Sequence, residues 1–151
     1  MSEQQLRTTQ RELLARVDEG WHQFRRALAA FPAERLDEPI GEGWTRKQML
    51  AHLAAWHESA NERLANFART GEQQPLTEDD DVFNARVARA AAGRTAGEVR
   101  DALESSFGRL RRQVGHLSDE QLAALEGWPA GVIASNTFAH YRDHLADLDW
   151  R

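Results

Sequence analysis

The chain of 151 residues contains no cysteine. Without cysteine, a protein cannot form disulfides, cannot bind zinc through thiolates and cannot use a cysteine as its nucleophile. Any metal ion must therefore be held by histidine, aspartate or glutamate side chains. The chain has six histidines and 24 acidic residues that would serve as donors.

Long hydrophobic runs are also missing from the chain. No stretch approaches the roughly 18 consecutive apolar residues that suggest a membrane-spanning helix. The polar start, MSEQQLRTTQ, lacks the apolar core of a secretory signal. We therefore expect a cytoplasmic protein that has no membrane partner.

Positive charge is in slight deficit. The chain has 19 Lys plus Arg against 24 Asp plus Glu, which gives a net charge of −5. A protein that neutralises the phosphates of a nucleic acid usually needs a basic excess. We therefore expect no nucleic-acid partner.

Apolar residues recur at helical spacing along the whole chain. Steps of three, four or seven residues between them are typical of amphipathic helices, and no segment alternates as a strand would. We expect long helices at residues 4–30, 46–70, 95–116 and 134–150, and short ones at residues 80–93 and 119–125.

Three helix starts are marked by capping boxes, in which a Ser or Thr is followed three residues later by Glu or Gln. The pairs are Thr45 with Gln48, Thr95 with Glu98, and Ser118 with Gln121. Four long amphipathic helices around one core predict an all-α four-helix bundle with short additional helices in its connections. At this length we expect a single domain that covers residues 1–151.

Three histidines form a pattern with chemical meaning. His140 and His144 lie four residues apart in a predicted helix, so both imidazoles project from one face and can reach a single metal ion. His52 flanks the apolar stripe of another predicted helix and would supply a third ligand. Three neutral imidazoles are a standard open ligand set for zinc, and nickel or iron also accept them.

Other chemically capable side chains are given simpler roles. The candidates to support the metal ligands are Asp143, Asp147 and Glu58. The histidines expected to be ordinary and partly exposed are His22, His57 and His116. The chain shows no glycine-rich phosphate loop and no Ser-His-Asp order with family context, and neither His140 nor His144 follows a glutamate by three residues, as in the ExxH pairs of di-iron bundles. We therefore assign no protein nucleophile and no general base.

Four segments resemble one family of helical bundles. Residues 41–64, GEGWTRKQMLAHLAAWHESANERL, and residues 138–148, FAHYRDHLADL, resemble the second and last helices of the DinB-like superfamily of metal-binding four-helix bundles. Residues 79–87, DDDVFNARV, and residues 98–122, EVRDALESSFGRLRRQVGHLSDEQL, are most similar to its ClbS/DfsB branch. The resemblance covers residues 10–150.

This resemblance implies a metal site and a class of chemistry. A divalent metal would be held by one histidine of the second helix and an HxxxH pair of the last, which map onto His52, His140 and His144. Relatives include thiol-dependent isomerases and S-transferases, and ClbS-like proteins that hydrolyse a reactive cyclopropane to protect the producing cell. A shared fold does not fix the reaction.

Two functions therefore remain open. The first is a metal-dependent hydrolase or thiol transferase that acts on a small electrophilic metabolite or toxin, with zinc or nickel as its cofactor. The second is a catalytically silent bundle that binds a small molecule or another partner. Either is compatible with a homodimer that forms through long helix faces.

Overall fold

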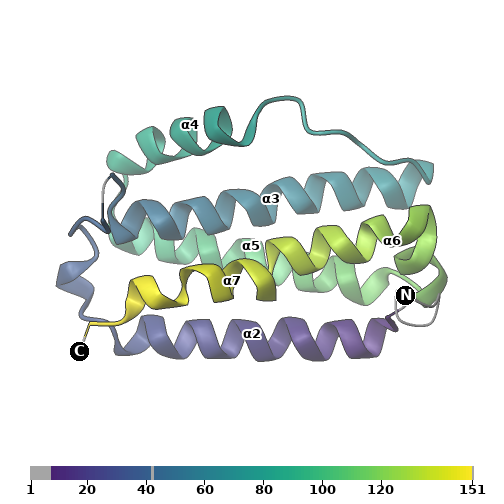
Figure 1. Ribbon diagram of the computed structural model, residues 1–151, viewed down its shortest axis with the longest axis horizontal. Helices are drawn as coiled ribbons and strands as arrows, with labels where there is room; N and C mark the ends of the chain where they lie inside the picture. The colour runs from purple at the N-terminus through teal and green to yellow at the C-terminus, as the bar shows by residue number, and fades with distance from the viewer. Residues whose placement is uncertain (1–7, 42, 151) are drawn as a thin grey trace.

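The computed structural model describes residues 8–41 and 43–150 (Figure 1). Within them, the regular structure is helical apart from one isolated bridge between Pro39 and Thr45. The elements are α2 (Gln10–Ala30), η1 (Ala33–Arg35), α3 (Arg46–Thr70), α4 (Asp80–Ala92), α5 (Ala96–His116), α6 (Asp119–Asn136), α7 (Phe138–His144) and η2 (Leu145–Leu148). The predicted all-α class is confirmed.

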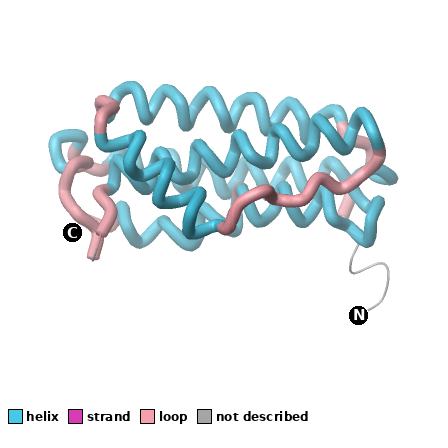
Figure 2. The backbone as a smooth tube through the Cα atoms, turned by 90° about the horizontal axis from the view of Figure 1, so that it is seen from above, coloured by secondary structure: helices cyan, strands magenta, loops and turns pink. Residues whose placement is uncertain are grey.

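The helices form a bundle in which one of the four positions is shared by two elements. Figure 1 shows α6 and α7 running one after the other between α2 and α3, with α5 behind them. The short helix α4 and the loop of residues 71–79 lie outside the bundle, next to α3 (Figures 1 and 2). Among the described residues, no helix has both the length and the apolar character that crossing a membrane requires.

All three predicted capping boxes are present. The side chains of Thr45, Thr95 and Ser118 each accept a hydrogen bond from the backbone N–H three residues on. In return, the backbone N–H of each capping residue donates to the Gln or Glu side chain at that position. The helix α3 then ends at Gly71, whose φ of +73° is a left-handed conformation that glycine adopts at little cost. The predicted helix at residues 46–70 is therefore confirmed at both ends.

Two of the predicted long helices differ from the structure by more than one residue at an end. The first begins at Gln10, because Thr9 has extended backbone and caps it; residues 4–7 of that prediction lie outside the described residues. The fourth, predicted at 134–150, is already helical in the second half of α6, is interrupted at Thr137, and continues through α7 and η2 to Leu148.

The sequence EGWPAG explains why the last helix starts early. The backbone leaves the helix at Ala124 and has positive φ at Leu125, Glu126 and Gly127, so the short helix ends at Ala123, two residues before the predicted limit of 125. The chain resumes helical geometry at Trp128. Pro129 then lies in the first turn, where its missing N–H would have no helical partner in any case.

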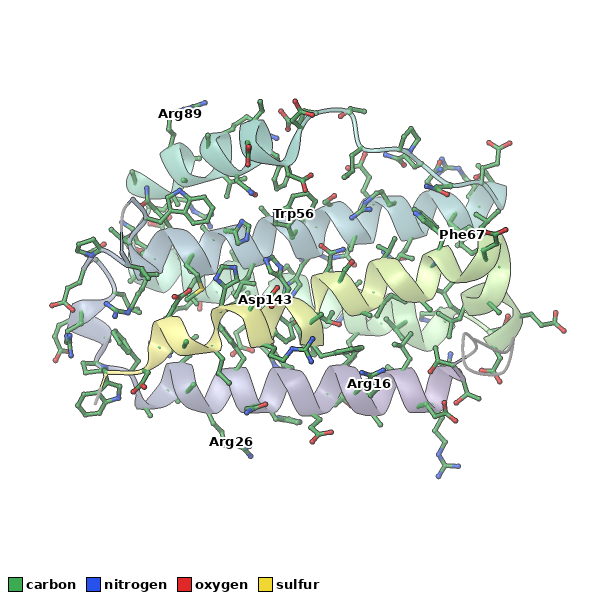
Figure 3. The ribbon with its side chains drawn as sticks, in the orientation of Figure 1. Arg16, Arg26, Trp56, Phe67, Arg89 and Asp143 are labelled. Carbon is green, nitrogen blue, oxygen red and sulfur yellow. The ribbon has the colours of Figure 1, made fainter. Side chains whose placement is uncertain are left out.

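The core lies where α2, α3, α5 and the α6–α7 pair face one another. Trp21 of α2 stacks on Phe107 of α5 with ring centroids 4.2 Å apart, and Tyr141 of α7 is 1% exposed beside them. Outside this core, Trp56 of α3 packs on Phe83 and so attaches α4 to the bundle (Figure 3).

We predict that Gly20→Ala destabilises the protein by about 1–3 kcal/mol, because the site is too tight for a methyl group. A Cβ added at Gly20 would lie 2.6 Å from Cβ and 3.0 Å from Cα of Phe138, where α2 meets α7. Urea unfolding measures the loss. The control is Gly131→Ala, which meets nothing within 4 Å and should be neutral or stabilising by up to about 1 kcal/mol. Equal effects of the two changes would contradict this account.

Candidate metal centre

The three predicted histidines meet at one place in the structure. His52 comes from α3, His140 and His144 come from α7, and one ring nitrogen of each lies within 4.8 Å of those of the other two. The ring centroids are 4.7 Å apart for His52 and His140, 5.2 Å for His52 and His144, and 5.0 Å for His140 and His144. The fold thus brings together residues 88 positions apart in the chain.

His52 is held in one orientation by Asn84 of α4. Nδ1 of His52 lies 3.1 Å from Oδ1 of Asn84, and the same oxygen accepts a 2.8 Å hydrogen bond from Nε1 of Trp56. An indole N–H only donates, so the acceptor is the amide oxygen, and Nδ1 of His52 must carry the hydrogen it donates there. Nε2 of His52 therefore carries no hydrogen, and its lone pair faces the other histidines.

His144 is oriented by a neighbour on the following turn. Its Nδ1 donates to Oδ2 of Asp147 at 2.9 Å, which leaves Nε2 for the cluster. The backbone oxygen of Asp147 accepts a 2.6 Å hydrogen bond from Nε of Arg46 at the start of α3. Asp147 was one of the predicted supporting residues, and the structure places it against His144.

His140 completes the cluster. Its Nε2 lies 2.8 Å from Nε2 of His52, and its Nδ1 is the buried side-chain atom without a hydrogen-bond partner in the described part of the chain. If Nε2 of His140 carries the hydrogen, Nδ1 is a buried, unpaired acceptor. If Nδ1 of His140 carries the hydrogen instead, the lone pairs on Nε2 of His140 and Nε2 of His52 face each other. A cation bound between the nitrogens removes that repulsion, so the donor set fits a metal ion.

Burial keeps the imidazoles of His52 and His140 neutral at physiological pH, because it lowers the pKa of each. The pKa of His52 is lowered to about 3, chiefly by burial and then by His140 and His144, while the hydrogen bond to Asn84 opposes the shift. The pKa of His140 is lowered to about 4 by burial and by His144. Neutral imidazole is the form that binds metal, so no proton has to be displaced from these nitrogens near pH 7.

A cleft of about 380 Å³ opens beside the histidines. Its lining comprises His52, Trp56, Arg63, Leu76, Asp80, Asn84, Ser135, Asn136 and His140. The ring of Trp44 lies 5.0 Å from that of His52 by centroid distance. A small molecule in this cleft would contact two of the three histidines.

His57 is not the partly exposed histidine that the sequence predicted. It is fully buried, and its pKa is lowered to about 3 by burial and then by His140. The hydroxyl of Ser106 donates to the carbonyl of Leu103, so it accepts from Nδ1 of His57 at 2.8 Å, and the hydroxyl of Tyr141 donates to Nε2 at 2.6 Å. The prediction failed because α3 is packed by other helices on several faces.

The remaining predicted side chains lie away from the cluster. Glu58 pairs with Arg109 at 2.8 Å, and Asp143 projects from α7 into solvent (Figure 3). His22 and His116 are exposed, as expected. Asn84 was not among the site residues predicted from the sequence. Asparagine is a weak helix former, and its place in the middle of a predicted helix was the available signal.

Comparison with known proteins identifies the family. Residues 17–146 match the model of the mycothiol maleylpyruvate isomerase N-terminal domain. The chain belongs to this family. The match places it in the DinB-like superfamily, as the sequence predicted. A search of curated proteins gave no significant match.

Solved structures from this superfamily share the fold at low identity. The colibactin self-resistance protein ClbS, in complex with double-stranded DNA, is 15% identical with a TM-score of 0.79, and 93% of each chain is covered. A protein from Streptococcus pneumoniae is 17% identical with a TM-score of 0.71, over 93% of this chain and 88% of that one.

An isomerase in the same family is larger than this chain. A histidine-to-alanine mutant of the mycothiol-dependent maleylpyruvate isomerase is 20% identical with a TM-score of 0.76. The comparison covers 95% of this chain and 62% of the isomerase, so the present chain corresponds to part of that protein. These similarities confirm the DinB-like fold and the ClbS-type relatives.

We predict that Tyr141→Phe lowers the free energy of unfolding by about 1–3 kcal/mol, because Nε2 of His57 is then buried without its donor. The aromatic ring and its packing are retained in this variant. Urea unfolding at pH 7.5 measures the effect. A change smaller than about 0.5 kcal/mol would show that the 2.6 Å hydrogen bond contributes little.

We also predict that stability falls as the pH drops from about 6.5 to about 4. The pKa values of His52 and His57 are lowered from 6.5 to about 3, and that of His140 to about 4. The unfolded chain takes up protons in this range and the folded chain does not, so the folded state loses roughly 1.4 kcal/mol per pH unit for each histidine.

Urea titrations between pH 7.5 and 4.5 in the presence of EDTA measure this slope. His57→Gln should reduce the slope, whereas the exposed control His116→Gln should leave it unchanged. An unfolding free energy that is the same at pH 7 and pH 4.5 would refute the prediction.

Proposed function

We propose that this protein is a metal-dependent enzyme that holds one divalent ion with His52, His140 and His144 and acts on a small electrophilic compound. One observation carries the proposal: ring nitrogens of the three histidines converge to within 4.8 Å. The outer nitrogens of His52 and His144 are held by Asn84 and Asp147. Hydrogen bonds of this kind commonly orient metal-binding histidines.

Zinc or nickel is the proposed ion. Three neutral imidazoles form an open site for zinc, which leaves a position for water or substrate, and nickel also accepts nitrogen ligands. An ion of this kind supplies a Lewis acid that lowers the pKa of a water or thiol ligand. The low pKa values of His52 and His140 keep both imidazoles available for it.

The reaction class we propose is attack on the electrophile by water or by a low-molecular-weight thiol. The thiol has to come from a small molecule because the chain contains no cysteine. Membership of the mycothiol maleylpyruvate isomerase N-terminal domain family supports the thiol route, and the similarity in fold to ClbS supports a role in detoxification or self-resistance. The cleft beside His52 and His140 would hold the electrophile while Trp56 covers its apolar part.

We predict that the double variant His140→Ala, His144→Ala loses stoichiometric metal binding and keeps its helical fold. The core is built by other residues of α7, among them Tyr141, which is 1% exposed. The experiment loads tag-free protein with zinc or nickel, removes excess ion by gel filtration, and measures metal by elemental analysis. Circular dichroism checks the fold.

The matched control is His22→Ala, His116→Ala, which removes two exposed histidines and should leave the metal content unchanged. Metal retained by the His140, His144 variant would show that the ion binds elsewhere. Wild-type protein that binds no ion after loading would favour the alternative of a catalytically silent binding module.

A further inference from the structure

We propose that Arg63 binds a carboxylate group of the substrate, at the end of the cleft opposite the histidines. The inference rests on the proposed function, because it places the reactive end of the same compound beside His52 and His140. It adds a substrate class, namely small electrophiles or thiol adducts that carry one carboxylate.

The position of Arg63 on α3 follows from helix geometry. It lies seven residues after Trp56 and eleven after His52, and at 100° per residue the three side chains share one face of the helix. Arg63 and His52 are about 16 Å apart along the helix axis. Both line the same cleft, with Trp56 between them. A ligand that lies along this face would contact all three.

Arg63 is buried and forms no ion pair with a described residue. It is 9% exposed, and its Nε donates a long hydrogen bond of 3.3 Å to the backbone oxygen of Ser59. No carboxylate of the described residues lies within 4.0 Å of its guanidinium nitrogens, and the residue lines the cleft without an ion pair. Burial lowers the pKa of Arg63, although Asp80 and Glu62 oppose the shift.

Two exposed arginines show the opposite pattern. Arg109 and Arg111 have side chains that are 47% and 48% exposed, and each forms an ion pair, with Glu58 and Asp18. A buried, unpaired guanidinium is costly, whereas an exposed one is not. A function in ligand binding explains why a buried arginine that lines the cleft has no ion pair.

Arg63 is the basic side chain of the cleft lining. His52 and His140 are neutral at pH 7, because burial lowers their pKa values, and a bound divalent ion would add positive charge. Asp80, on α4, is the acidic residue of the lining, and it is exposed to solvent. A guanidinium fork matches a carboxylate in two hydrogen bonds, and one positive charge balances one carboxylate.

The test uses mercaptocarboxylic acids of increasing chain length and mercaptoalcohols of the same lengths as probes. The protein is loaded with cobalt(II), and absorption from thiolate-to-cobalt charge transfer reports thiol binding at the histidines. In the wild type, one length of acid should bind about tenfold or more tightly than its alcohol. In Arg63→Gln the acid should lose this advantage while the alcohol binds as before, and Arg63→Lys should retain part of it.

Arg69→Gln is the matched control, since Arg69 lies on the same helix but is exposed and bonded to Asn66. It should bind acids and alcohols as the wild type does. Equal binding of acids and alcohols by cobalt-loaded wild type would overturn the carboxylate site and leave the metal site standing.

A second measurement does not depend on the metal. In metal-free protein, the Nε–H signal of Arg63, assigned by its loss in Arg63→Gln, is followed by NMR during titration with the same acids. A saturable shift with the acids, absent with the alcohols, supports the carboxylate site even if no cobalt binds and the proposed function fails. No shift at saturating acid overturns it.

Discussion

The hydrogen bond between Tyr141 and His57 joins α7 to α3 inside the core, and the geometry of the histidine cluster depends on it. The two atoms are 2.6 Å apart, and Ser106 of α5 occupies the other nitrogen of His57. Tyr141 is the neighbour of His140, so rotation of α7 about its axis would break this bond and move His140 away from His52. Because both partners are buried, an unpaired alternative is costly, and α7 keeps one orientation.

A second polar contact couples the accessory helix to the site. Asn84 lies on α4, outside the bundle, yet its side-chain oxygen accepts from both Trp56 and His52. Near the start of α3, Gln48 donates to the backbone oxygen of Ala88 at 2.9 Å and holds the same helix. Attachment of α4 therefore fixes the tautomer of His52 and also forms one wall of the cleft. The accessory helix belongs to the site as much as the bundle does.

The fold and the chemistry rest on different kinds of evidence. Solved structures at 15% to 20% identity establish the DinB-like architecture, and the family match covers residues 17–146. The proposed metal enzyme is supported by three histidines of this chain, by their burial and by the side chains that orient them. The expected lack of a nucleic-acid partner likewise rests on the net charge of −5, although ClbS has been crystallised with double-stranded DNA.

The sequence by itself determined the helices and identified three histidines as candidate ligands, because helix ends and the step from His140 to His144 depend on local spacing. Capping boxes and apolar periodicity located α3 at residues 46–70, and the four-residue step placed His140 and His144 on one face. Tertiary structure alone decided that His57 is buried, that Asn84 orients His52, and that Arg63 lines the cleft unpaired. Local patterns say which face of a helix a side chain occupies. Packing decides what lies opposite that face, and therefore whether a polar side chain meets water, a partner or a ligand.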